Sequence, residues 1–262
     1  MELFDRLVNE TVSSGIEPVT LNFTGIYDCY SARPVAYRTE TEMFSSVSGK
    51  IKEAAEKVDK TETGKNFTAH NIVKAIRCIK AMVAEKRRIS WISVSATTAF
   101  LTQDDLYSAL DNIFKAENFT ENDKLCLEFS KSILTAEREK VLKGLADLKV
   151  LGVKTVISGV AADDFPTSAL LDVAVDTVIL TPAITGLALD RNKPGVLASL
   201  IRFLRSMDVS VIAEGVENDD ELRELNKAEC FGFIPSENYS GRFTVIKGTH
   251  DFASALCEKE DA

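Results

Sequence analysis

The sequence has few histidines, no closely spaced cysteines and no long apolar run. It contains two histidines, His70 and His250, and neither has a nucleophile or metal-binding partner nearby in the sequence. Five cysteines are scattered and never spaced as C-x-x-C, which indicates reduced thiols rather than disulfides or a zinc site. No stretch approaches the ~18 apolar residues of a membrane span. The first residues lack a secretory apolar core, so we expect a cytoplasmic protein without membrane contact.

An excess of positive charge is also missing. The formal net charge is -9. Binding to a nucleic acid polymer needs basic patches that neutralise phosphates, so we expect no polymeric nucleic acid partner. The 262 residues match the roughly 250 that one barrel of strands and helices requires. We therefore predict a single domain over residues 1–262, with its motif-bearing part at about 19–248.

What the sequence does have is a regular alternation of strand-like and helix-like stretches. Helical spacing of apolar residues in "NIVKAIRCIKAMVAEKRR" predicts a helix over 71–88 with a basic last turn. "NDDELRELNKA" begins with the capping-box spacing of Asn218 and Glu221. The predicted strands are 19–26, 34–38, 89–95, 124–130, 153–158, 177–180, 209–214 and about 231–233.

Eight strands that mostly alternate with helices predict an α/β fold, a TIM-like (β/α)8 barrel whose functional groups lie at the carboxyl ends of the strands. Alternation also predicts which side chains face inward. In "KLCLEFS", Cys126, Glu128 and Ser130 face the barrel interior while the leucines and Phe129 face the helices. In "VSVIAE", Glu214 shares the inward face with Ile212.

The stretch "VIAEGVENDDELRELNKAECFGF" strongly resembles the EAL domain family, whose members hydrolyse cyclic di-GMP. The rest of the chain follows in the family's order, through "LNFTGIYD", "VAYRTETEMF", "WISVSATTAFL", "LCLEFSKS", "LGVKTVISGVA" and "DTVILT". The resemblance implies a barrel of the EAL type. It also implies two divalent cations, magnesium or manganese, that activate a water for attack on the phosphodiester.

The family's metal and catalytic positions are mostly replaced here. The glutamate of the EAL motif falls on Arg38, the metal-binding asparagine on Ser93, and the second acid of "EITE" on Lys131. The paired aspartates of "DDFG" fall on Ser158 and Gly159, the lysine and aspartate of "KID" on Ile179 and Thr181, and the late glutamine on Ile234. The phosphate-facing arginine falls on Glu42. Glu128 and Glu214 remain, with Glu217 completing "AEGVE". Because Arg38 and Lys131 bring positive charge to a cation site, we expect no catalytic residues and no cofactor.

Two interpretations of the remaining acids stay open. Glu128 and Glu214 are residual metal ligands, or they pair with Arg38 or Lys131 in a salt-bridge cluster at the barrel mouth. Glu217 is part of this site or an acid placed ahead of a helix start. Asp163 and Asp164 resemble a family motif but fall five residues too late, so we expect a loop there.

These observations predict a catalytically inactive EAL-like domain that regulates cyclic di-GMP-related signalling through an unidentified protein partner. One alternative is a metal-independent cyclic di-GMP receptor that uses Arg38 and Lys131. A second is an active phosphodiesterase, with magnesium or manganese held by relocated ligands such as Asp163 or Asp164. A third is an unrelated barrel enzyme with its substrate at the same mouth. The resemblance also makes a homodimer possible.

Overall fold

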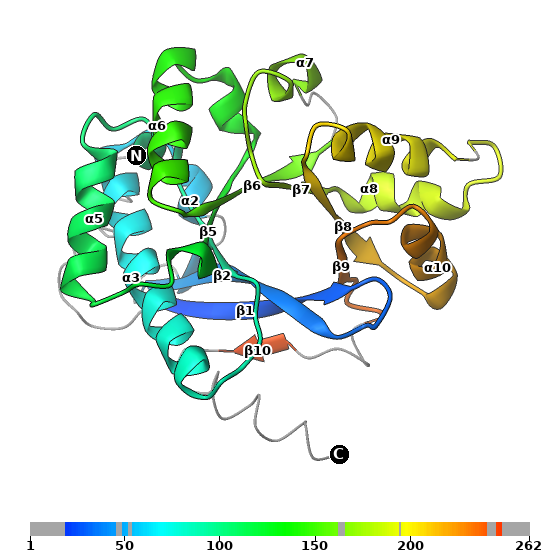
Figure 1. Cartoon of the computed structure of the whole chain (residues 1–262), viewed down its shortest axis with the longest axis horizontal. Coiled ribbons are helices and arrows are strands. Elements are labelled where there is room, and N and C mark those ends of the chain that lie inside the picture. Colours follow the sequence, from blue (N-terminus) through cyan, green and yellow to red (C-terminus); the bar gives the residue numbers. More distant parts are fainter. Residues whose placement is uncertain are drawn as a thin grey trace.

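The computed structural model describes residues 19–45, 49–51, 54–161, 166–193, 195–239 and 245–247. Strands and helices alternate along the chain (Figure 1). The strands are β1 (Val19–Asp28), β2 (Pro34–Ser45), β3 (Gly49–Ile51), β4 (Ile92–Ser95), β5 (Leu125–Phe129), β6 (Lys154–Val160), β7 (Thr177–Leu180), β8 (Ser210–Val216), β9 (Gly232–Pro235) and β10 (Val245–Lys247). The helices are α2 (Ala54–Lys57), α3 (Glu62–Ala84), α4 (Thr98–Leu101), α5 (Leu106–Ala116), α6 (Arg138–Val150), α7 (Thr167–Leu170), α8 (Pro182–Thr185), α9 (Val196–Arg205) and α10 (Asp219–Lys227), with 3-10 turns η1 (Asn122–Lys124), η2 (Lys131–Thr135) and η3 (Gly186–Leu189).

Eight of these strands close into a barrel, as the sequence predicts. The order around the ring is β1-β9-β8-β7-β6-β5-β4-β2, and β2 pairs again with β1. β3 and β10 extend the sheet outside the ring, on β2 and β1. All ring neighbours are parallel except β1, which runs antiparallel to both β2 and β9.

The reversed direction of β1 follows from the short segment between β1 and β2. A parallel crossover needs a dozen or more residues, and residues 29–33 are too few for one. The turn is held by the Asp28 carboxylate, which accepts hydrogen bonds from the backbone N–H groups of Tyr30 and Ser31. Ala32 takes a left-handed φ of 52°. Since β1 is reversed, this turn lies at the same end of the barrel as the amino-terminal ends of the other strands.

The predicted inward and outward faces are confirmed. Cys126 and Ile212 belong to a small apolar cluster inside the barrel that also contains Ile26, Ala36, Trp91, Val156, Ile179 and Ile234. Leu125, Leu127 and Phe129 belong to the larger cluster between barrel and helices. The interior of the barrel is therefore filled with apolar side chains, and its inward polar side chains lie at the carboxyl end of the strands.

The predicted helix over 71–88 is wrong at both ends. α3 runs from Glu62, capped by the Thr61 side chain, to Ala84. Lys86 takes a left-handed φ of 59°, and the backbone N–H of Arg87 bonds to the Met82 carbonyl. The basic run 86–88 thus lies beyond the helix, in the segment that leads to β4. The chain provides no helix, within the part described, with the length and apolar character needed to cross a membrane.

Candidate functional site at the barrel mouth

The carboxyl ends of the parallel strands carry inward polar side chains from several parts of the sequence. Arg38 of β2 is in register with Ser93 of β4, and Ser95 of β4 is in register with Glu128 of β5. Glu214 precedes a bulge in β8, where Gly215 takes a φ of 82°. A Cβ on Gly215 would lie 2.6 Å from Cβ of Pro182, so a glycine is needed for α8 to pack here.

Arg38 and Glu128 form the centre of this site. Nε of Arg38 lies 2.9 and 3.0 Å from the two carboxylate oxygens of Glu128, and Nη2 lies 2.6 Å from Oε1. The hydroxyl of the fully buried Ser93 donates to Oε2 of Glu128 at 3.2 Å. Glu128 is only 4% exposed, so its negative charge requires these partners.

The same guanidinium reaches across the mouth to Glu214. Nη1 of Arg38 donates to Oε1 of Glu214 at 2.8 Å, so one arginine joins the carboxylates of β5 and β8. Glu214 is more open, at 30% exposure, than Arg38 at 18%. Burial lowers the pKa of Arg38, but the charges of Glu128, Glu214 and Glu40 raise it above its ordinary value. The guanidinium therefore remains a fixed cation.

The other predicted site residues lie on neighbouring elements. Lys131 begins η2 just beyond β5, and Ser158 is half-buried at a bulge near the end of β6. Glu217 is exposed beyond β8. Asp163 and Asp164 lie outside the described residues, as does the side chain of Glu42.

The acids after β8 include a helix cap. The Asn218 side chain accepts from the backbone N–H groups of Asp220 and Glu221, as capping-box spacing predicts. The Glu221 carboxylate accepts from the backbone N–H of Glu217 at 2.7 Å rather than from that of Asn218. Glu217 thus contributes its backbone to the start of α10.

Sequence reasoning missed a row of hydroxyl groups that runs from the end of β5 through η2 to α4. The Ser130 and Ser132 hydroxyls are 2.7 Å apart, and that of Ser132 is 2.8 Å from Oγ1 of Thr98. The hydroxyl of Thr181, which follows β7, is buried and lacks a hydrogen-bond partner among the described residues. The inward position of Ser130 and the motif position of Thr181 were the available signals, because Thr98 and Ser132 belong to short helical turns that alternation cannot orient.

The charged side chains at the mouth are arranged as ion pairs with one another and not as ligands of a cation. Within the described ranges, no three or more His, Cys, Asp or Glu side chains are grouped so as to hold a metal ion. The two strand-end carboxylates instead face one guanidinium. A divalent cation between them would lie against the positive charge of Arg38.

Comparison with known protein families shows which family the chain belongs to. The family model of the EAL domain matches residues 12–233. The chain belongs to the EAL domain family. The Arg38 cluster therefore lies at the mouth of an EAL barrel. No curated protein matches the sequence.

Solved structures of EAL proteins share the fold at low identity. The EAL enzyme Bd1971, bound to cAMP and cyclic di-GMP, is 13% identical with a TM-score of 0.79, and the match covers 97% of this chain and 68% of that chain. The phosphodiesterase PaMucR in complex with c-di-GMP is 14% identical with a TM-score of 0.76, covering 93% and 97%. An EAL domain protein from Listeria monocytogenes EGD-e is 15% identical with a TM-score of 0.74, covering 98% and 96%.

Proposed function

We propose that this EAL domain is catalytically inactive and acts as a regulatory, protein-interacting module in cyclic di-GMP-related signalling. The observation that carries the proposal is the position of Arg38, whose guanidinium contacts both Glu128 and Glu214 at 2.6–3.0 Å. The donors at the mouth do not fit a pair of divalent cations, because hard cations need several free oxygen ligands. Hydrolysis of a phosphodiester by metal-activated water is therefore not supported.

The charge at the mouth also disfavours a cyclic dinucleotide. The positive charge of Arg38 is outweighed by the two carboxylates that it contacts, and Glu40 adds another negative charge nearby. The N–H groups of Arg38 that bond to Glu128 and Glu214 are not available to a phosphate without breaking those bonds. A protein partner that recognises the barrel surface is the better supported alternative.

The test is titration of the purified chain with cyclic di-GMP by calorimetry and thermal shift, with and without Mg²⁺ and Mn²⁺. A ligand in ~100-fold excess over its dissociation constant stabilises a protein by about 2.7 kcal/mol, so even weak binding is measurable. We expect no shift and no linear product under any condition. A shift without metal identifies a receptor, whereas a metal-dependent shift with loss of the ligand contradicts the proposal.

The partner is tested separately, by purifying complexes of the tagged chain and reconstituting each from purified components. A reconstituted complex that is unchanged by cyclic di-GMP supports regulation through protein contact. A complex that forms only in the presence of cyclic di-GMP would show that the chain senses this ligand, which contradicts regulation by protein contact alone.

A further inference from the structure

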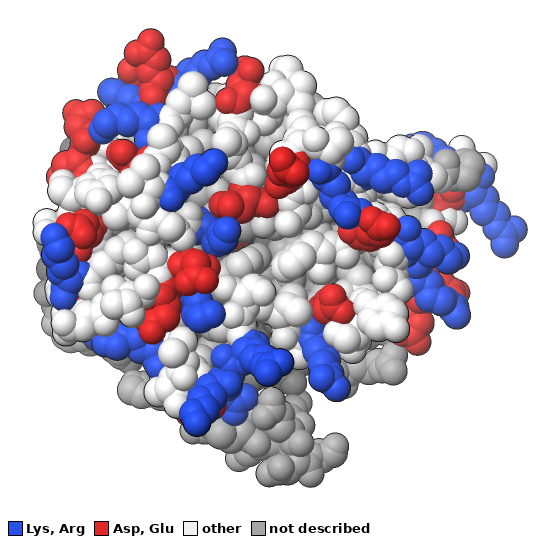
Figure 2. Space-filling view, in the orientation of Figure 1, with Lys and Arg blue, Asp and Glu red and all other residues white. Residues whose placement is uncertain are grey.

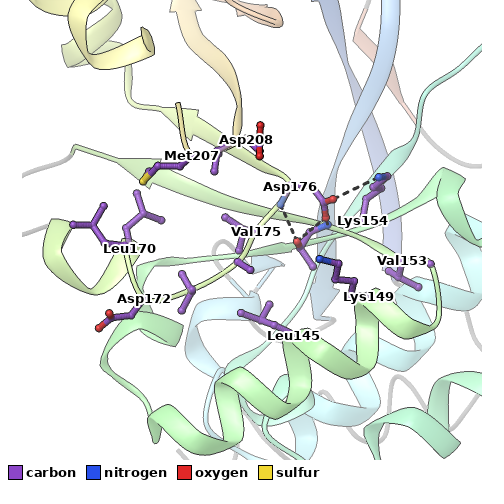
Figure 3. A pocket seen from close by; sticks show the side chains of 16 residues that line it. Leu145, Lys149, Val153, Lys154, Leu170, Asp172, Val175, Asp176, Met207 and Asp208 are labelled. Atoms are coloured by element: carbon purple, nitrogen blue, oxygen red, sulfur yellow. Dashed lines mark hydrogen bonds and ion pairs between the residues drawn. The ribbon is translucent and has the colours of Figure 1, made fainter. Parts of the chain in front are cut away.

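A pocket of about 620 Å³ lies at the end of the barrel opposite the mouth, beside the amino-terminal ends of β6, β7 and β8. This volume is within the roughly 300–1,000 Å³ of most small-molecule sites. The lining comes from α6, from α7 and the segment after it, and from the turns that precede β6, β7 and β8 (Figure 3). The pocket is therefore separate from the Arg38 cluster, which lies at the carboxyl ends of the strands.

Buried apolar side chains form the inner lining of the pocket. Leu145 of α6, Leu170 of α7, Val175 before β7 and Val209 before β8 all line it, and all are buried. Met207 is half-buried and lines it as well. An apolar group of a ligand would be removed from water against these side chains, which favours binding.

Two aspartates of the lining already have partners. Oδ2 of Asp176 accepts from the backbone N–H and from the hydroxyl of Thr155, each at 2.8 Å, and Oδ1 lies 3.5 Å from Nζ of Lys154. Asp172 pairs with Arg138 at 3.4 Å. A ligand could use these groups only by competing with the bonds that they already make.

Lys149 and Asp208 are the charged residues of the lining that remain. Both are exposed, and neither forms an ion pair or a side-chain hydrogen bond with a described residue. Lys149 lies in the last turn of α6, and Asp208 follows α9 with a left-handed φ of 60°. Figure 3 shows the two residues on different sides of the pocket. One ammonium and one carboxylate thus border an apolar lining.

The charges around the pocket do not favour a ligand of one sign. The lining contains two lysines and three aspartates, and the pair between Arg138 and Asp172 balances the third aspartate. Figure 2 likewise shows acidic and basic side chains interspersed over the face in view, with neither sign covering it. A polyanion or a polycation is attracted by a surface of one sign, so the pocket suits a ligand that carries both charges.

From this arrangement we infer that the pocket binds a small zwitterion with an apolar side chain. The carboxylate of the ligand meets Lys149, its ammonium meets Asp208, and its side chain contacts the apolar lining. Free amino acids and dipeptides share this chemistry. A ligand with only one of the two charges leaves the other protein group without a charge-assisted hydrogen bond. The inference does not rest on the function proposed for the mouth, which lies at the other end of the barrel.

Calorimetric titration of the full chain with leucine and with the dipeptide Leu-Leu, up to about 10 mM, tests the inference in the range of weak binding. Three analogues each lack one part of leucine: 3-methylbutylamine lacks the carboxylate, 4-methylpentanoate the ammonium, and glycine the apolar side chain. We expect each to bind at least ~10-fold more weakly than leucine, because a hydrogen bond between charged groups or a buried apolar group is lost. Tighter binding of leucine identifies an amino acid site, and tighter binding of Leu-Leu a peptide site.

Two variants assign the charged contacts. Lys149→Met should weaken leucine binding at least ~10-fold and leave 3-methylbutylamine unaffected, because that amine has no carboxylate. Asp208→Asn should weaken both of these ligands and leave 4-methylpentanoate unaffected. Asparagine also tolerates the left-handed backbone of this position. Lys143→Met is the matched control, because Lys143 lies on the same helix but bonds to the Asp104 carbonyl.

The absence of heat and of a thermal shift with both leucine and Leu-Leu overturns the inference. Binding that Lys149→Met and Asp208→Asn leave unchanged overturns it as well, as does equal binding of the three analogues. Circular dichroism of each variant separates loss of binding from loss of fold. Titration with cyclic di-GMP tests the mouth alone, so either result can fail without the other.

Discussion

Arg38 contacts Glu128 through two of its nitrogens, Nε at 2.9 Å and Nη2 at 2.6 Å from the same carboxylate oxygen. This side-on approach leaves Nη1 directed at Glu214 on the other side of the mouth. The Arg38 side chain thereby neutralises part of the negative charge of Glu128 and Glu214, which lie far apart in the sequence.

Arg38→Ala should destabilise the fold by about 3 kcal/mol, because removing Arg38 leaves the buried carboxylate of Glu128 uncompensated. Urea denaturation measures the change. Arg77→Ala is the control, since Arg77 is 66% exposed in its pair with Glu117 and its loss should cost less than about 1 kcal/mol. We also expect Mn²⁺ to restore part of the stability of Arg38→Ala and none in the parent chain. An equal effect of Mn²⁺ on both would show that the guanidinium does not exclude the cation.

The two acids should differ in their contributions. Glu128→Gln should cost about 2–3 kcal/mol, because a buried, charge-assisted set of hydrogen bonds is weakened. Glu214→Gln should cost less than about 1 kcal/mol, because this residue is 30% exposed and accepts a single bond from Arg38. Both values come from the same denaturation experiment. Equal losses would mean that burial does not set the strength of these ion pairs.

Gly215→Ala should be more destabilising than Gly159→Ala. Both glycines have left-handed backbones, with φ of 82° and 74°, so each alanine should cost about 1–2 kcal/mol. At Gly159 no atom lies within 4 Å of the added Cβ, whereas at Gly215 the Cβ would meet Pro182. Overpacking adds about 1–3 kcal/mol at the second site. Melting temperatures of the two variants test the difference, and a smaller loss at Gly215 would show that α8 moves freely.

Stability should fall in alkali through the buried thiols. Burial raises the pKa of Cys78 to about 11 from an ordinary value of 9.0, and Lys74 offsets part of this. Between these pH values the unfolded chain releases the proton and the folded chain keeps it, so the free energy of unfolding decreases as pH rises. The slope from this thiol is at most about 1.4 kcal/mol per pH unit. Cys78→Ala should reduce the slope measured between pH 9 and 11, and an unchanged slope would assign the effect elsewhere.

The fold was largely predictable because strand periodicity and the length of each connection carry it. The antiparallel direction of β1 was also predictable, since residues 29–33 are too few for a parallel crossover. The start of α3 was not predictable, because Glu62 to His70 lack the apolar repeat of the later turns. These residues are held in the helix by the Thr61 cap and by packing. Strands β3 and β10 are short and lie outside the ring, and they gave no separate signal.

The site was predictable as a set of positions but not as a set of bonds. Alternation and strand ends place Glu128 and Glu214 around one mouth, and the resemblance to the EAL family adds Arg38 and Ser93. The hydrogen bonds between the Arg38 nitrogens and the carboxylates depend on the shear of the barrel and on the rotamer of Arg38. Neither can be predicted from the local sequence. The hydroxyl chain through Thr98 and Ser132 likewise depends on how α4 meets η2.

The closing seam of the barrel has a consequence for the order of folding. β1 and β9 share only two register pairs, Tyr27 with Phe233 and Asp28 with Gly232, and these join the first and last strands of the ring. Contacts between segments so distant in sequence form slowly, because a long loop must be ordered first. During synthesis the β1–β2 hairpin must therefore wait, with one edge unpaired, until nearly the whole chain has been made. That interval is when chaperones or aggregation would act on the nascent chain.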